Sequence, residues 1–126
     1  MISVRRSTDQ DREHLKSCIK ADPFHEEQDP RSWSETMTFA DDEGPVFHVV
    51  SEPGYFDELR IHIQFGESKL RTARTLIQGW PKYKQVAKAQ GFKSLVFDST
   101  NAELINFCTK YFGFKHDSDC DYRLPL

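Results

Sequence analysis

The chain lacks any long hydrophobic run. Its apolar stretches fall far short of the about 18 residues that a membrane-spanning helix needs, so no transmembrane segment is predicted. The first six residues, MISVRR, also lack the apolar region of a secretory signal. From these two absences we expect a cytoplasmic protein without a membrane partner.

Cysteine is scarce as well. The 3 cysteines, Cys18, Cys108 and Cys120, lie far apart and form neither a CxxC pair nor a Cys/His metal spacing. An odd and sparse number of cysteines is typical of reduced thiols in a cytosol rather than of a disulfide framework. The sequence therefore predicts no metal site.

Several catalytic and nucleotide-binding patterns are missing. The chain has only 6 glycines, and it contains no glycine-rich dinucleotide fingerprint and no Walker loop. It also contains no HExxH and no GxSxG pattern. These absences argue against dinucleotide-dependent redox chemistry, P-loop nucleotide hydrolysis, zinc-dependent proteolysis and α/β-hydrolase chemistry.

Acidic residues are missing from one segment of an otherwise acidic protein. The net charge of −3 argues against general nucleic-acid binding, but it combines −8 over residues 1–68 with +5 over residues 69–126. The acid-free segment contains these basic residues: Lys69, Arg71, Arg74, Lys82, Lys84, Lys88 and Lys93. Such a run is either a solvated helix face or an anion-binding site, and the sequence leaves both interpretations open.

The residues that are present suit a folded protein. Of the 126 residues, 37% are hydrophobic and 13% aromatic, which excludes wholesale disorder. This length suits one domain and not two. We therefore expect a single domain over residues 1–126.

Hydrophobic periodicity and turn residues predict elements in the order β α β β β α β α β β. Helices are predicted over Asp9–Lys20, from residues 66–68 to Gly91, and from Ser99 or Thr100 to about Tyr111. Strands are predicted over Ile2–Arg6, Thr36–Ala40, Pro45–Ser51, Leu59–Phe65, Ser94–Phe97, Phe114–His116 and Tyr122–Leu124. A strand–helix–strand crossover implies a parallel pair, and successive hairpins imply antiparallel pairs. We therefore expect an α/β fold in which helices flank a mixed sheet.

The long central helix of this prediction has two distinctive features. Pro81 lies inside its apolar pattern, and an interior proline costs about 3 kcal/mol, so we expect a kink or a break at Gly79-Trp80-Pro81. Trp80 and Tyr83 alternate with lysines, as in surfaces that stack nucleic-acid bases. Their helical spacing favours the buried face of the helix instead, so no nucleic-acid partner is expected.

Two short motifs accompany this order of elements. A strand that ends with Ile61, His62 and Ile63 is followed by SKLRTA at residues 68–73 and then by Leu76-Ile77. A later strand and helix are followed by Gly113-Phe114. Together these features resemble the GNAT N-acetyltransferase superfamily, in which a central strand leads to Gln/Arg-x-x-Gly-x-Gly/Ala and then to Leu-Leu. The resemblance covers most of the chain and implies a GNAT-like central mixed sheet flanked by helices.

The resemblance implies acetyl-CoA or CoA as the cofactor. In the family, the central strand holds the pantetheine arm, which assigns that role here to Ile61 and Ile63. Amides at the start of the next helix bind the pyrophosphate, helped by the helix dipole. The corresponding residues are Lys69, Arg71, Thr72, Ala73 and Arg74. Arg71 replaces the first loop glycine, so it can either add positive charge for the phosphates or fill the groove with its side chain.

Asn101 begins the last predicted helix. In family members, residues at this place contact coenzyme A, which makes Asn101 a further cofactor-binding candidate. A role as the N-cap of the helix explains the asparagine equally well.

The resemblance is weakest for catalytic residues. Four residues before the glycine of Gly-Phe, the family often has a proton-donating tyrosine, and this chain has Thr109. His62 is the candidate general base, because imidazole titrates near neutral pH, and a hydrogen-bonded strand histidine is the alternative. Glu58 is either a further base or a solvated turn residue. We interpret His48, which shares a strand face with Val50, as a hydrogen-bonded core histidine.

The predicted function is acetyl-CoA-dependent N-acyl transfer to an amine, either a small molecule or a protein N-terminus or lysine. Residues 21–34, where the family recognises acceptors, do not indicate which amine. The missing tyrosine and glycine favour the alternative, a catalytically inactive GNAT-like binding or interaction module. A third interpretation is a module that binds an acidic partner through Lys82–Lys93. A homodimer is left open.

Overall fold

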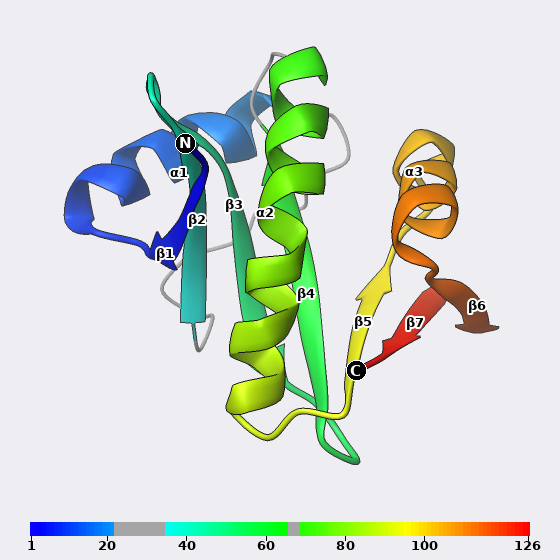
Figure 1. Ribbon diagram of the computed structural model, residues 1–126. Coiled ribbons are helices and arrows are strands. Elements are labelled where there is room, and N and C mark those ends of the chain that lie inside the picture. The colour runs from blue at the N-terminus through cyan, green and yellow to red at the C-terminus, as the bar shows by residue number, and fades with distance from the viewer. Residues whose placement is uncertain (22–34, 66–68) are drawn as a thin grey trace.

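The computed structural model describes residues 1–21, 35–65 and 69–126, without the side chains at positions 19, 21, 64, 65 and 69. Within this part of the chain, seven strands form one sheet in the order β1-β2-β3-β4-β5-β7-β6 (Figure 1). The strands are β1 (Ser3–Arg6), β2 (Glu35–Asp41), β3 (Gly44–Pro53), β4 (Glu58–Phe65), β5 (Ser94–Asp98), β6 (Lys115–Ser118) and β7 (Asp121–Pro125). The helices are α1 (Asp9–Ala21), α2 (Lys69–Ala89) and α3 (Ala102–Phe112). The predicted α/β class and order of elements are confirmed.

The sheet is mixed in the predicted way. β4 and β5 are parallel, and every other neighbouring pair is antiparallel. The chain leaves β4, passes through α2 and returns as β5, which is the crossover that a parallel pair requires.

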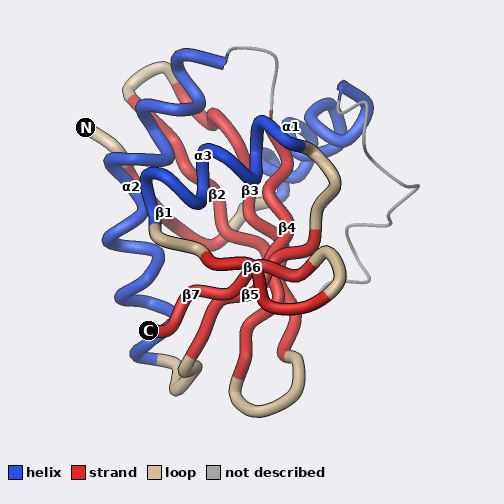
Figure 2. Tube along the Cα trace, turned by 90° about the vertical axis from the view of Figure 1, so that its right-hand side faces the viewer, coloured by secondary structure: helices blue, strands red, loops and turns tan. Residues whose placement is uncertain are grey.

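Helices cover both faces of this sheet. α1 and α2 lie on opposite sides (Figure 2). On the α1 side, Leu15 and Cys18 are 0% and 1% exposed and pack toward β3 and β4. α3 joins the layer of α2, because Phe112 stacks on Trp80 with ring centroids 4.6 Å apart.

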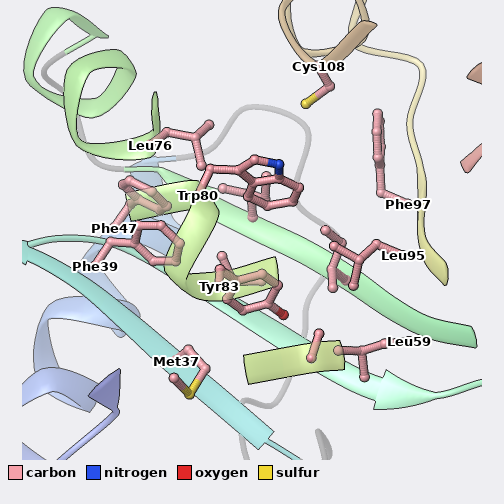
Figure 3. Packing of buried hydrophobic residues seen from close by; sticks show 14 of the residues in the cluster. Met37, Phe39, Phe47, Leu59, Leu76, Trp80, Tyr83, Leu95, Phe97 and Cys108 are labelled. Atoms are coloured by element: carbon pink, nitrogen blue, oxygen red, sulfur yellow. The ribbon is translucent and has the colours of Figure 1, made fainter. Parts of the chain in front are cut away.

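The main core lies between α2 and the sheet (Figure 3). Trp80 and Tyr83 are almost fully buried, and their rings stack with centroids 5.6 Å apart. Phe39 of β2 contacts Tyr83 and stacks on Phe47 of β3 at 4.5 Å. The interpretation of Trp80 and Tyr83 as the buried helix face is confirmed, so these two rings are not exposed to stack on nucleic-acid bases.

The predicted break at Gly79-Trp80-Pro81 is wrong, because α2 runs as one helix from Lys69 to Ala89. Pro81 lies on the exposed side of the helix, and Ile77, whose carbonyl loses its amide partner, is 44% exposed. Water can therefore reach that carbonyl. Trp80 and Tyr83 flank the proline and are buried in the same core. Burial of two such rings offsets the about 3 kcal/mol that an interior proline costs.

The helix ends predicted at Gly91 and Gly113 and the N-cap role of Asn101 are confirmed, whereas α3 begins at Ala102 rather than at Ser99 or Thr100. The side-chain oxygen of Asn101 accepts hydrogen bonds from the amides of Glu103 and Leu104, at 3.1 and 3.4 Å, which caps α3. Gly113 follows α3 with φ 80°, and Gly91 follows α2 with φ 95°, the left-handed conformation in which helices often end. No helix in the described ranges is long and apolar enough to cross a membrane.

Candidate functional site

β4 and β5 pair over three residues and then separate. The register consists of Glu58 with Ser94, Leu59 with Leu95 and Arg60 with Val96. β4 continues to Phe65, paired with β3 along its other edge, while β5 diverges from it (Figure 1). From Ile61 onward, β4 is therefore not paired with β5 in the described part of the chain. The backbone N–H and C=O groups on that edge of β4 lie outside the ladder of hydrogen bonds between the two strands. A ligand that enters between the strands can hydrogen-bond to these groups.

The first turn of α2 lies at the end of the molecule where these strands separate (Figure 1). The helix begins at Lys69 and has no acidic residue in its first turn. Leu70 is 81% exposed, so the amides of this turn are near solvent. A helix N-terminus with unpaired N–H groups attracts phosphate. The fold thus brings the predicted pantetheine and pyrophosphate segments to one end of the protein, and the start of α3 at Asn101 lies there too.

Arg71 is already paired within the protein. Its Nε and Nη2 atoms donate hydrogen bonds of 2.7 and 2.6 Å to the carboxylate of Asp41, the last residue of β2. These hydrogen bonds hold the pKa of Asp41 well below its usual range and raise the pKa of Arg71. A carboxylate oxygen of Glu43 lies 3.6 Å from the same guanidinium. The side chain therefore ties α2 to the hairpin, and its charge is largely neutralised.

The side chains at the other predicted phosphate-binding positions differ in their exposure to solvent. Arg74 is exposed and forms no ion pair within the described ranges. Thr72 is 6% exposed and Ala73 is half-buried, so their side chains offer little to a ligand, and both residues follow the first three of α2, whose amides are the unpaired ones. Lys69 is the first residue of the helix. Of these described side chains, Arg74 is thus the exposed basic one that can form an ion pair with an anion at this helix terminus.

The residues at the candidate catalytic positions lie on β4 and on α3. His62 is half-buried on the part of β4 that β5 does not pair with, opposite Val50 of β3. Thr109 is exposed on α3 and has no group that donates a proton at neutral pH. Its neighbour Cys108 is buried, which raises the pKa of that thiol to about 12 and keeps it from acting as a thiolate.

Glu58 is not a solvated turn residue. It is 5% exposed, and its two oxygens accept hydrogen bonds from Arg60 at 3.1 Å and from Arg123 at 2.9 Å. Arg60 also binds Asp121, and Arg123 also binds Asp117. Burial raises the pKa of Glu58, but the hydrogen bonds from both arginines outweigh burial and lower it overall. A carboxylate held in this way is a poor general base, which leaves His62 as the candidate.

Replacement of Glu58 by alanine should lower the free energy of unfolding by about 2 kcal/mol, because it removes two hydrogen bonds between charged groups. The pKa of Glu58 is lower in the folded than in the unfolded chain. The contribution of Glu58 to the free energy of unfolding is therefore fully present above the unfolded-state pKa of about 4.3. It is lost as the pH falls through the lower pKa that Glu58 has in the folded protein. Denaturant unfolding of Glu58→Gln at neutral and acidic pH should show a weaker acid dependence than the original protein. Glu52→Ala, at an exposed position on β3, is the control, and equal acid dependence in Glu58→Gln would contradict the assignment.

Two buried polar atoms of α2 were not singled out from the sequence. Thr75 Oγ1 and Trp80 Nε1 have no hydrogen-bond partner within the described ranges. Helical periodicity assigns both residues to the apolar face, and it gives no information on whether their polar atoms are satisfied. An unpaired buried donor costs free energy, so a ligand that entered beneath α2 would gain by accepting a hydrogen bond.

Comparisons with known proteins bear on the fold alone. No family model matches the sequence, and no curated protein matches it. Solved structures do match over nearly the whole chain. An acetyltransferase of the GNAT family from Staphylococcus aureus Mu50 has a TM-score of 0.77 at 10% identity, with 100% of this chain and 99% of that chain covered.

Two further structures agree with this match. The ribosomal-protein-S18-alanine N-acetyltransferase of Escherichia coli has a TM-score of 0.71 at 10% identity, covering 100% of this chain and 94% of that one. A domain from Methanocaldococcus jannaschii has a TM-score of 0.74 at 20% identity, and the match covers 100% of this chain and 99% of that one. The chain therefore has the fold of the GNAT acetyltransferases, and the predicted GNAT-like architecture is confirmed.

Proposed function

We propose that this protein is an N-acyltransferase that uses acetyl-CoA and transfers the acyl group to an amine. The observation that carries the proposal is the separation of β4 from β5 beside the first turn of α2. An extended ligand with amide groups and a diphosphate needs a free strand edge next to a helix N-terminus, and both are present. The backbone thus fits coenzyme A, although Arg71 is held by Asp41.

The residues of this chain then have separate tasks. Acetyl-CoA supplies a thioester whose acyl group an amine nitrogen can accept. The backbone of Ile61 and Ile63 binds the amides of the pantetheine arm, and the unpaired amides of the first turn of α2, at residues 69–71, bind the diphosphate. His62 accepts a proton from the ammonium group of the acceptor, which leaves a neutral amine able to attack. The amine nitrogen forms the new bond to the acyl carbon as the C–S bond breaks, and the departing thiolate takes a proton from solvent, since Thr109 cannot donate one. Positioning of the two reactants supplies a large part of the barrier reduction in such a step.

Calorimetric titration with acetyl-CoA and with free CoA tests cofactor binding. Replacement of Arg74 by glutamate should weaken both affinities by about tenfold, because it puts a negative charge at the helix terminus that faces the phosphates. Lys82→Glu is the matched control, since it makes the same charge change at an exposed site about two turns further along α2. We expect Lys82→Glu to bind both ligands like the original protein.

Arg71 is less suited to this test. Arg71→Glu would place a third carboxylate beside Asp41 and Glu43, so it would destabilise the hairpin contact as well as the helix terminus. No heat of binding from either ligand at millimolar concentration would contradict the proposal. Equal weakening by Arg74→Glu and Lys82→Glu would place the anion elsewhere on α2.

A second candidate function is a GNAT-like module that binds coenzyme A without catalysis. The observation that favours it is the exposed Thr109 at the place where the family often has a tyrosine. Release of free CoA from acetyl-CoA, measured with a thiol reagent, separates the two functions. The panel of acceptors includes small amines, peptides with a free N-terminus and peptides with an accessible lysine. Binding of acetyl-CoA without thiol release from any acceptor would favour the non-catalytic module.

A further inference from the structure

Three metal-ligating side chains meet between α1 and the sheet, on the face opposite α2. His14 and Cys18 are four residues apart on α1 and therefore share one side of the helix. His48 projects from β3 toward them. The Nδ1 atom of His14 lies 2.8 Å from Nε2 of His48 and 3.6 Å from Sγ of Cys18. All three ligand atoms lie within 4.8 Å of one another.

The cluster is largely shielded from water but has one accessible side. Cys18 is 1% exposed and His48 is 0% exposed, whereas His14 is half-buried. An ion can therefore approach past His14 and be held by two ligands that do not compete with bulk water. Imidazole nitrogen and thiol sulfur together favour zinc over the hard cations magnesium and calcium.

A second layer of hydrogen bonds orients His48. Its Nδ1 atom lies 3.0 Å from Oγ1 of Thr38, and this hydroxyl lies 2.7 Å from Oγ of Ser7. When His48 Nδ1–H donates to Thr38, the Nε2 lone pair points at the cluster and accepts a hydrogen bond from His14 Nδ1–H, which a bound metal ion would replace. Metal-binding histidines usually have such a partner on the second ring nitrogen, because it fixes the tautomer and the ring orientation.

Two of the three separations between ligand atoms are close to those of a zinc centre, and the third, between Cys18 Sγ and His48 Nε2, is within 4.8 Å. Zinc bonds of about 2.05 Å to nitrogen and about 2.3 Å to sulfur place two nitrogen ligands about 3.3 Å apart and nitrogen about 3.6 Å from sulfur. The separation between Cys18 and His14 is already 3.6 Å. The two histidine nitrogens, 2.8 Å apart, need to separate by about 0.5 Å to reach the zinc value, which a small rotation of the half-buried His14 ring achieves.

We propose that His14 Nδ1, Cys18 Sγ and His48 Nε2 bind one Zn²⁺, with a water molecule as the fourth ligand. Binding converts the Cys18 thiol to a thiolate and releases its proton to solvent, while both imidazoles bind in the neutral form. The ion joins α1 to β3 and adds to the packing of Leu15 that holds α1 on the sheet. This site lies apart from the α2 terminus and does not depend on the acyltransferase proposal.

Cobalt binding tests the ligand set directly. The protein is stripped with a chelator, desalted under reducing conditions and titrated with Co²⁺ and then with Zn²⁺. We expect one ion per chain, the intense visible bands of four-coordinate cobalt, and a near-ultraviolet thiolate-to-cobalt charge-transfer band that Zn²⁺ abolishes by displacing cobalt. Cys18→Ala should remove the charge-transfer band. His14→Gln should weaken zinc binding by at least about 100-fold, because loss of a direct ligand exceeds the effect of losing an outer hydrogen bond.

Matched controls use the same residue types outside the cluster. Cys120→Ala and His116→Gln, both at exposed positions, should leave the spectrum and the affinity unchanged. Circular dichroism verifies that each variant is folded, and X-ray absorption of the zinc-loaded original protein provides a measurement that needs no variant. One sulfur and two imidazoles around zinc support the proposal. A shell without sulfur, a millimolar dissociation constant, or loss of binding in Cys120→Ala would overturn it.

Discussion

Replacement of Trp80 by alanine should lower the free energy of unfolding by about 3–5 kcal/mol. The indole is 3% exposed and packs from α2 against Phe112 of α3 and the core over the sheet. Its ring centroid is 5.6 Å from that of Tyr83, 4.6 Å from that of Phe112 and 5.9 Å from that of Phe114. Alanine would leave a cavity among aromatic rings that are themselves packed and unable to collapse into it. Urea denaturation measures the loss as a lower midpoint with an unchanged slope.

Two variants separate the cavity from other causes. Trp80→Phe keeps an aromatic ring and removes the indole N–H, which has no partner within the described ranges, so it should cost about 1–2 kcal/mol. Tyr55→Ala removes an aromatic side chain that is 83% exposed and should change stability by at most about 0.5 kcal/mol. A loss below about 1 kcal/mol in Trp80→Ala would show that α2 and α3 are not joined through this ring.

Replacement of His62 by glutamine should lower the turnover of acyl transfer by about 100-fold, because a positioned general base contributes about this much to the rate. Glutamine is polar and similar in length, so the half-buried position on β4 stays filled. Affinity for acetyl-CoA should not change, because the proposed binding contacts of β4 are made by its backbone. Steady-state kinetics with any acceptor that the thiol-release panel identifies measures the effect, as a lower kcat with little change in KM for acetyl-CoA.

The pH profile adds a second readout. Loss of a general base should abolish the acidic limb of kcat/KM that His62 sets in the original protein, since the remaining rate no longer depends on its protonation. His116→Gln, at an exposed position on β6, is the control and should keep both the rate and the profile. Full turnover in His62→Gln would show that water or another residue accepts the proton.

Most of the fold follows from local pattern. The alternation of Leu59, Ile61 and Ile63 predicts a strand with one core face, and all three side chains are buried in the core cluster. Gly91 and Gly113 predict helix ends because the left-handed conformation suits glycine, and both adopt it. Pro81 is the exception: an interior proline has a real local cost, but burial of the neighbouring rings outweighs that cost and α2 continues through it.

The site was less predictable, because its decisive contacts join residues that are distant in sequence. Arg71 pairs with Asp41 across 30 positions, and Arg123 pairs with Glu58 across 65. His14 meets His48 across 34 positions. A single sequence offers no signal for such pairings. His14 and Cys18 are four residues apart on α1, but two candidate ligands on a helix do not predict a metal site without the strand residue that faces them.

The sequence by itself determined the class of fold, the order of its elements, the buried face of α2 and the location of the basic segment at the start of that helix. These features depend on periods of two and of 3.6 residues and on turn residues, which act over a few neighbouring positions. Only the tertiary structure decided which charges are free. It neutralised Arg71, buried Glu58 between two arginines, left Arg74 exposed and separated β4 from β5 beside the α2 terminus. The reason is that these ion pairs, and the separation of the two strands, depend on contacts between segments that are distant in sequence. Such contacts form only when the chain folds.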